Sequence, residues 1–114
     1  MNAQHRSEQP DGQLAEAVAA AVRAHPAVVD LDGGPFGAIA SYLPGRRVVG
    51  VQVGEPDEPV KVSVVARLGI PLPQLATELR QVITAVTGAR AIDLTVNDVI
   101  TGGDVITGGP EPPP

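Results

Sequence analysis

Residues 60–99, VKVSVVARLGIPLPQLATELRQVITAVTGARAIDLTVNDV, contain the pattern that decides the fold. Between Val60 and Leu68, apolar residues alternate with Lys61, Ser63 and Arg67. This period of two predicts a strand with one buried face. A stretch with helical spacing and a second alternating stretch follow, so the segment predicts a strand–helix–strand unit.

The helix of this unit has a clear start, apolar face and end. Pro73 suits a first helical turn because its missing N–H is not needed there. Apolar residues then recur at helical spacing from Leu75 to Val86, and Gly88 is a typical C-terminal stop. Ile92 to Asn97 alternates again and predicts the second strand, with a right-handed crossover if the two strands are parallel.

Upstream of this unit, the pattern predicts a helix followed by a short strand. Apolar positions from Gly12 to Ala24 line one helical face, with Asp11 as the N-cap. Pro26 disfavours helical geometry in the residue before it, so the helix should stop at His25. Ala27 to Asp32 alternates apolar and acidic side chains, which is typical of a half-buried strand.

A hairpin is expected between the two halves of the chain. Phe36 to Leu43 and Arg46 to Val53 flank Pro44-Gly45, a dipeptide suited to the centre of a type II turn. The resulting order, αββββαβ, predicts an α+β fold with a single small sheet and two helices packed on one of its faces.

One domain is expected over residues 11–99, between a disordered lead-in (residues 1–10) and a flexible Gly/Pro-rich tail (residues 100–114). The tail region contains a tandem repeat, Asp98–Gly103 and Asp104–Gly109, each reading DVITGG. Two copies are too few for a repeat architecture. We interpret them as a strand end followed by a linker.

Composition narrows the classes of function. The 114 residues are 43% hydrophobic and 2% aromatic, which predicts an aliphatic core and argues against sites that bind by stacking. A net charge of −5 opposes attraction to nucleic-acid phosphates, so no nucleic-acid partner is expected. The chain has no cysteine, which excludes disulfides and thiolate ligands, and no stretch has the length and hydropathy of a membrane span.

The residues typical of catalysis do not converge in the sequence. His5 and His25 have no second metal ligand at helical spacing. Asp30 and Asp32 lie about 6–7 Å apart along one side of a strand, but a solvated face is the commoner explanation. The glycine-rich Gly33–Gly37 has no Lys-Ser/Thr ending for phosphate binding. We therefore predict no enzyme activity, no cofactor and no metal.

Four residues are candidates for partner or anion contact. Arg46 and Arg47 follow the predicted turn, and with Arg67 they offer guanidinium groups that suit a carboxylate or a small anion. Val65 is an apolar residue on the otherwise polar side of its strand. A small anion- or metabolite-binding regulatory domain that uses the three arginines is the alternative to a protein-interaction domain.

The succession of elements resembles the alkaline-shock, or envelope-stress, protein family. LAEAVAAAVRA (Leu14–Ala24) and His25–Gly34 are similar to the family's opening helix, "P-G-V-x-x-L" strand and glycines, with Ala27 in place of the usual glycine. Val60–Val99 is similar to its strand, proline-initiated helix, "T-G" stop and final strand. FGAIASYLPGRRVVGVQV (Phe36–Val53) looks like the short variant of high-GC actinobacterial members.

This resemblance implies a non-enzymatic interaction or scaffold domain of the envelope stress response. It implies a cytoplasmic location, peripheral at the inner face of the membrane through a small membrane-anchored protein partner, and self-association in some members. The duplicated hexapeptide and the proline-rich end depart from the family's better-known members. We expect contacts through a sheet edge, the Val65 face or the Arg46-Arg47 turn.

Overall fold

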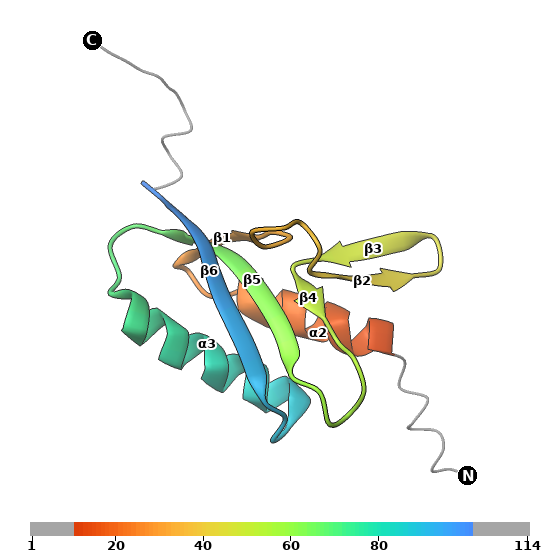
Figure 1. Ribbon diagram of the computed structural model, residues 1–114. Helices are drawn as coiled ribbons and strands as arrows, with labels where there is room; N and C mark the ends of the chain where they lie inside the picture. Colours follow the sequence, from red (N-terminus) through yellow and green to blue (C-terminus); the bar gives the residue numbers. More distant parts are fainter. Residues whose placement is uncertain (1–10, 102–114) are drawn as a thin grey trace.

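The computed structural model describes residues 11–101, which form an α+β fold (Figure 1). The expected lead-in, residues 1–10, and all but the first two residues of the expected tail (100–114) lie outside the described residues. The elements in chain order are α2 (Asp11–Arg23), β1 (Val28–Leu31), β2 (Ala40–Leu43), β3 (Arg46–Val49), β4 (Val51–Gln52), β5 (Val60–Arg67), α3 (Leu72–Thr87) and β6 (Ile92–Ile100).

Strand β5 is the centre of a four-stranded sheet. It pairs in parallel with β6 along its whole length. Its other edge is shared by two short antiparallel strands, with β4 beside Lys61 and Val62 and β1 beside Val64 to Ala66. Between them, Ser63 donates its N–H to the Gly50 carbonyl and accepts from the Asp32 N–H. The central strand is therefore hydrogen-bonded on both edges without a gap.

The prediction of a single sheet is wrong in one respect, because β2 and β3 form a separate two-stranded sheet. The expected strand Arg46–Val53 breaks at Gly50, whose φ of 93° turns the chain. Its first half pairs with β2 and its second half with β5. The predicted turn is confirmed, since Gly45 has the positive φ, 80°, that a type II turn needs after Pro44.

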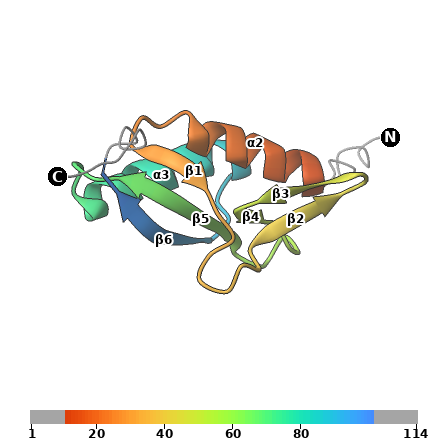
Figure 2. The ribbon, with the colours of Figure 1, turned by 90° about the horizontal axis from the view of Figure 1, so that it is seen from above.

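Both helices lie on one side of the sheet, as predicted, and the β1–β2 loop lies on the other (Figure 2). The strand side chains that face the helices are aliphatic, and β5 alone contributes four fully buried ones, Val60, Val62, Val64 and Ala66. Leu75, Leu79 and Ile83 of α3 meet them together with the buried face of α2. At about 25 cal/mol per Å² of buried apolar surface, this contact is the main source of stability.

Strand β1 differs from the expected alternation. Val28 and Leu31 are buried, whereas the pattern places Val29 and Leu31 together on one side. The pairing with β5 shifts between Val28 and Asp30, so Val29 is an extra residue that forms a bulge. Strand β6 has a matching shift, and it also runs to Ile100, one residue past the expected domain end.

A first prediction concerns Gly50, where the expected strand is interrupted. A Cβ atom there would lie 2.5 Å from Leu31 Cβ, in addition to the unfavourable positive φ. Gly45 also has a positive φ, but a Cβ atom there would meet nothing within 4 Å. We expect Gly45→Ala to lower the free energy of unfolding by about 1–2 kcal/mol through backbone strain.

The variant Gly50→Ala should cost about 1–3 kcal/mol more than Gly45→Ala, because the added methyl group overpacks the contact with β1. Urea unfolding followed by far-UV circular dichroism measures both variants. Equal losses would show that the close approach to Leu31 contributes nothing.

Candidate interaction surface

The outer edge of β6 is the longest unpaired stretch of backbone in the described part of the chain. Within residues 11–101, this nine-residue strand pairs on one side only, with β5. The Ala91 carbonyl accepts from Val60 N–H and the Ile100 carbonyl accepts from Leu68 N–H. In a parallel pair, alternate residues direct both backbone groups to the same side. Ile92, Leu94, Val96 and Val99 therefore direct theirs outward.

The composition of β6 does little to protect this edge. Natural edge strands are commonly guarded by charged side chains, especially lysine, by proline or by β-bulges. The stretch IDLTVNDVI has no lysine, arginine or proline, and its guards are Asp93, Asp98 and the bulge at Asn97, which leave the backbone from Leu94 to Val96 uncharged. Arg80 of α3 donates to the outward Ile92 carbonyl at 2.9 Å, so the first carbonyl of the edge already has a partner.

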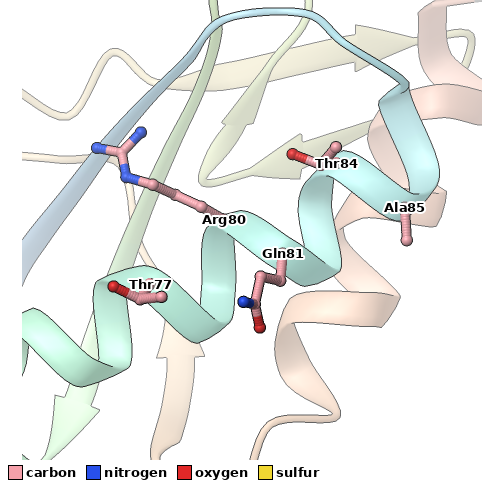
Figure 3. A pocket seen from close by; sticks show the side chains of 5 residues that line it. All are labelled: Thr77, Arg80, Gln81, Thr84 and Ala85. Atoms are coloured by element: carbon pink, nitrogen blue, oxygen red, sulfur yellow. The ribbon is translucent and has the colours of Figure 1, made fainter.

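Helix α3 presents a shallow hollow of about 520 Å³ on its exposed side. Figure 3 shows its lining, with Arg80 reaching toward β6. The other lining residues are Thr77, Gln81, Thr84 and Ala85. Because most of these side chains are short, another surface can approach the helix closely here.

Val65 lies on the sheet face opposite the helices and is half-buried. Its partners are Asp30 on β1 and Asp98 on β6, and each pairing immediately follows a bulge. The predicted placement on the side away from the core is confirmed. Both strands beside Val65 change register at this point, so the sheet is locally more twisted there.

A polar cluster crosses the same face of the sheet. The Asp32 carboxylate accepts from Ser63 Oγ at 2.7 Å, Asn97 Nδ2 at 2.8 Å and Gly34 N–H at 3.1 Å. Ser63 is completely buried, although its place in the alternating pattern predicts an exposed side chain. The glycine-rich loop after β1 covers it, since a Cβ atom on Gly34 would lie 3.7 Å from Ser63 Oγ.

The cluster around Asp32 joins the loop after β1 to β5 and β6. Partial burial pushes the pKa of Asp32 up, but the hydrogen bonds from Asn97, Ser63 and Gly34 outweigh this and leave the pKa below its ordinary value. Asp30 is engaged elsewhere, with Arg23 at 3.4 Å. The two carboxylates therefore do not act on one shared site.

The three candidate arginines do not form one site. Arg46 pairs with Glu16 in the first half of α2. Arg67 donates to the Pro26 carbonyl, beyond the last residue of α2. Glu16 precedes the last residue of α2, Arg23, by about 10 Å along the helix axis. Arg46 and Arg47 line a hollow of about 410 Å³ between α2 and β3.

That hollow is poorly suited to a free anion. Glu16 and Arg23 also line it, Glu16 already pairs with Arg46, and Arg23 pairs with Asp30. Among the described residues, this leaves Arg47 as the one guanidinium of the hollow without an acidic partner. A single exposed guanidinium is weak support for an anion site.

His25 connects the end of α2 to α3, a contact that the sequence did not reveal. Its Nδ1 accepts from Ala27 N–H at 3.0 Å, and Nε2 lies 2.7 Å from Glu78 Oε1. Hydrogen bonds from Gln74 and then from His25 lower the pKa of Glu78. Both ring nitrogens are engaged, so His25 has no free nitrogen for a metal or a substrate.

Both aromatic side chains of the chain are on the surface. Phe36 is 93% exposed in the loop after β1, and Tyr42 is 74% exposed on β2. The loop around Phe36 is closed by hydrogen bonds from Gly37 N–H to the Gly34 carbonyl and from Ile39 N–H to the Gly33 carbonyl. The core is therefore aliphatic, as predicted, and Phe36 is an exposed apolar side chain.

A second prediction concerns the cluster around Asp32. Asp32→Ala leaves the buried Ser63 hydroxyl without its acceptor, so we expect the free energy of unfolding to fall by about 1–3 kcal/mol. Adding Ser63→Ala should recover part of this loss, because the unpaired hydroxyl is then removed. Asp93→Ala, at an exposed aspartate of β6, is the control and should change little.

The contribution of Asp32 gives the free energy of unfolding a pH dependence of definite sign. The pKa of Asp32 is lower in the folded protein than in the unfolded chain, where it is near 3.8. The stability that the Asp32 carboxylate contributes is therefore complete above the pKa of the unfolded chain and is lost as the pH falls through the pKa of the folded protein. Asp32→Ala should therefore lose less stability than the wild type on acidification from about pH 5. Equal slopes in chemical unfolding at several pH values would contradict this assignment.

Within residues 11–101, no group of three His, Cys, Asp or Glu residues could hold a metal. Neither helix of this part of the chain has the length and hydropathy to cross a membrane. Comparison with known proteins found no matching family model, no similar curated protein and no similar solved structure.

Proposed function

We propose that this domain is a non-enzymatic protein-interaction module that binds an extended strand along the outer edge of β6. The observation that carries the proposal is the nine-residue edge that has no partner strand within residues 11–101. Backbone groups along such an edge give affinity, and alternate side chains give specificity. Neither the Asp32 cluster nor the arginine hollow supports a competing chemistry.

The first half of the edge suits pairing with a second copy of the same chain. In an antiparallel pair centred on Thr95, Leu94 lies opposite Val96 and Asp93 lies opposite Asn97. Leu94 and Val96 both direct their backbone groups outward, so they can exchange hydrogen bonds as a closely bonded pair. No two like charges face each other in this register, and apolar side chains meet on the helix side of the sheet.

The wider context of the proposal comes from the resemblance to the envelope-stress family. On that ground we propose that the module also engages a small membrane-anchored protein and acts as a scaffold in the cytoplasm. The β6 edge supports this proposal in one respect, because it offers backbone groups with which a strand of the partner can pair.

The third prediction tests the edge by adding a charge at its centre. Thr95 faces the side of the sheet away from the helices, and two copies of it would be directly opposed in the pair. Thr95→Lys should therefore weaken self-association by about two- to fivefold, because like charges in opposed positions are destabilising. Sedimentation equilibrium from about 1 to 100 µM measures the dissociation constant.

The matched control is Ala17→Lys, which adds the same charge at an exposed position of α2, an element that does not pair with β6. It should leave the dissociation constant unchanged. Phe36→Ala should leave stability unchanged, since that side chain is almost fully exposed. If Phe36→Ala weakens association and Thr95→Lys does not, the aromatic loop is the interface and the β6 proposal is wrong.

A further inference from the structure

The side chains of β6 differ between the two faces of the sheet. On the helix side, the first three are aliphatic and half-buried, namely Ile92, Leu94 and Val96. On the opposite face, Asp93 pairs with Lys61 of β5, and Asp98 pairs with Val65 after the bulge. The outer edge of β6 (Figure 1) therefore offers an apolar row on one face and two carboxylates on the other.

The inner neighbour of β6 already matches this pattern. Strand β5 places Lys61 beside Asp93 and Ser63 beside Thr95 on the face away from the helices. On the helix side, its buried valines lie beside the aliphatic residues of β6. Because β6 presents the same two faces to a neighbour on either edge, a strand with the pattern of β5 also suits the outer edge.

We propose that the outer edge of β6 selects a strand with aliphatic side chains on one face and a basic side chain near each end of the other face. This inference rests on the proposed function of the edge and names the chemistry of its partner. Asp93 and Asp98 are the specificity-determining residues, because a lysine or arginine of the added strand can pair with each of them. A protein with such a strand binds more tightly than a second copy of the chain.

Both carboxylates are available for this contact. Asp93 and Asp98 are exposed, and within residues 11–101 neither takes part in an ion pair. Asp98 Oδ1 accepts from Val99 N–H at 2.9 Å, which holds the carboxylate in place and leaves its charge unpaired. The net charge of −5 also attracts a basic partner over longer distances. Attraction of the whole chain favours encounter, and the two local pairs determine the register.

The usable part of the edge is residues 93–97. At one end, Arg80 donates to the Ile92 carbonyl at 2.9 Å, so this acceptor already has a partner. At the other end, the bulge at Asn97 interrupts the regular spacing. A strand that is centred on Thr95 therefore places one of its ends opposite Asp93 and the other opposite the bulge.

A second copy of the chain matches this stretch less well. In the antiparallel pair centred on Thr95, Asp93 lies opposite Asn97 of the second copy, and Asp98 of that copy follows directly in the bulge. The two carboxylates are then neighbours on one face of the sheet, and neighbouring like charges weaken strand pairing. A basic residue at each end of the added strand replaces these repulsions with attractions.

The test compares two short peptides on the full chain. The probe is acetylated and amidated Lys-Val-Ser-Val-Lys, and its counterpart has glutamate in place of both lysines. Each sequence is the same in both directions, so the comparison does not depend on strand polarity. Nuclear magnetic resonance follows the amides of Leu94 and Val96 in dilute protein, with up to about 5 mM peptide. We expect the lysine peptide to bind about fivefold more tightly or better.

Matched variants assign this preference to the edge. Asp98→Asn should lower the ratio of the two dissociation constants about twofold or more, and adding Asp93→Asn should bring it to about one. Asparagine keeps an oxygen that can accept from Val99 N–H, so the fold should be retained. The control is Glu16→Gln, which removes one negative charge from α2, an element that does not pair with β6. It should leave the ratio unchanged.

Three results would overturn the inference. If both peptides shift the Leu94 and Val96 amides with equal affinity, the edge binds strands without selection by charge, and the proposed function stands alone. If Glu16→Gln lowers the ratio as much as Asp98→Asn does, the preference comes from net charge and not from the edge. If neither peptide shifts these two amides, strand addition at β6 fails, and this inference fails with it.

Discussion

The hydrogen-bonding needs of β5 determine the arrangement of the rest of the domain. This strand is buried on the helix side, so its backbone groups must find partners on both edges. One neighbour, β6, covers a whole edge, while β1 and β4 cover the other with Ser63 bonded between them. The turn at Gly50 and the bulges at Val29 and Asn97 are the local adjustments that allow these strands to fit.

Elements whose signal lies within one segment were predictable. The strand at Val60, the helix that begins near Pro73 and stops at Gly88, and the strand at Ile92 all follow from periodicity and end signals. The break at Gly50 was not predictable in this way, because it depends on which strand each half of Arg46–Val53 pairs with. The same holds for the bulge that brings Val28, and not Val29, into the core.

In the candidate site too, features that follow from a local pattern were predictable, and features that depend on distant segments were not. Val65 was placed correctly on the face away from the core, since that follows from alternation. Arg46, Arg47 and Arg67 share a charge but not a location, because the fold separates the hairpin from the end of β5. The burial of Ser63 depends on a loop that begins more than thirty residues earlier in the chain, so no local pattern could reveal it.

Several arginines of this domain donate hydrogen bonds to backbone carbonyls. Arg80 binds the Ile92 carbonyl, and Arg90 binds those of Gly54, Glu55 and Glu58. Carbonyl oxygens do not titrate, and arginine keeps its charge at any ordinary pH. Acid that neutralises the Asp32 carboxylate weakens the contacts around Ser63 and Asn97, but it leaves the arginine contacts in place at the end of the sheet where β5 and β6 begin. The two parts of the sheet therefore respond differently to proton concentration.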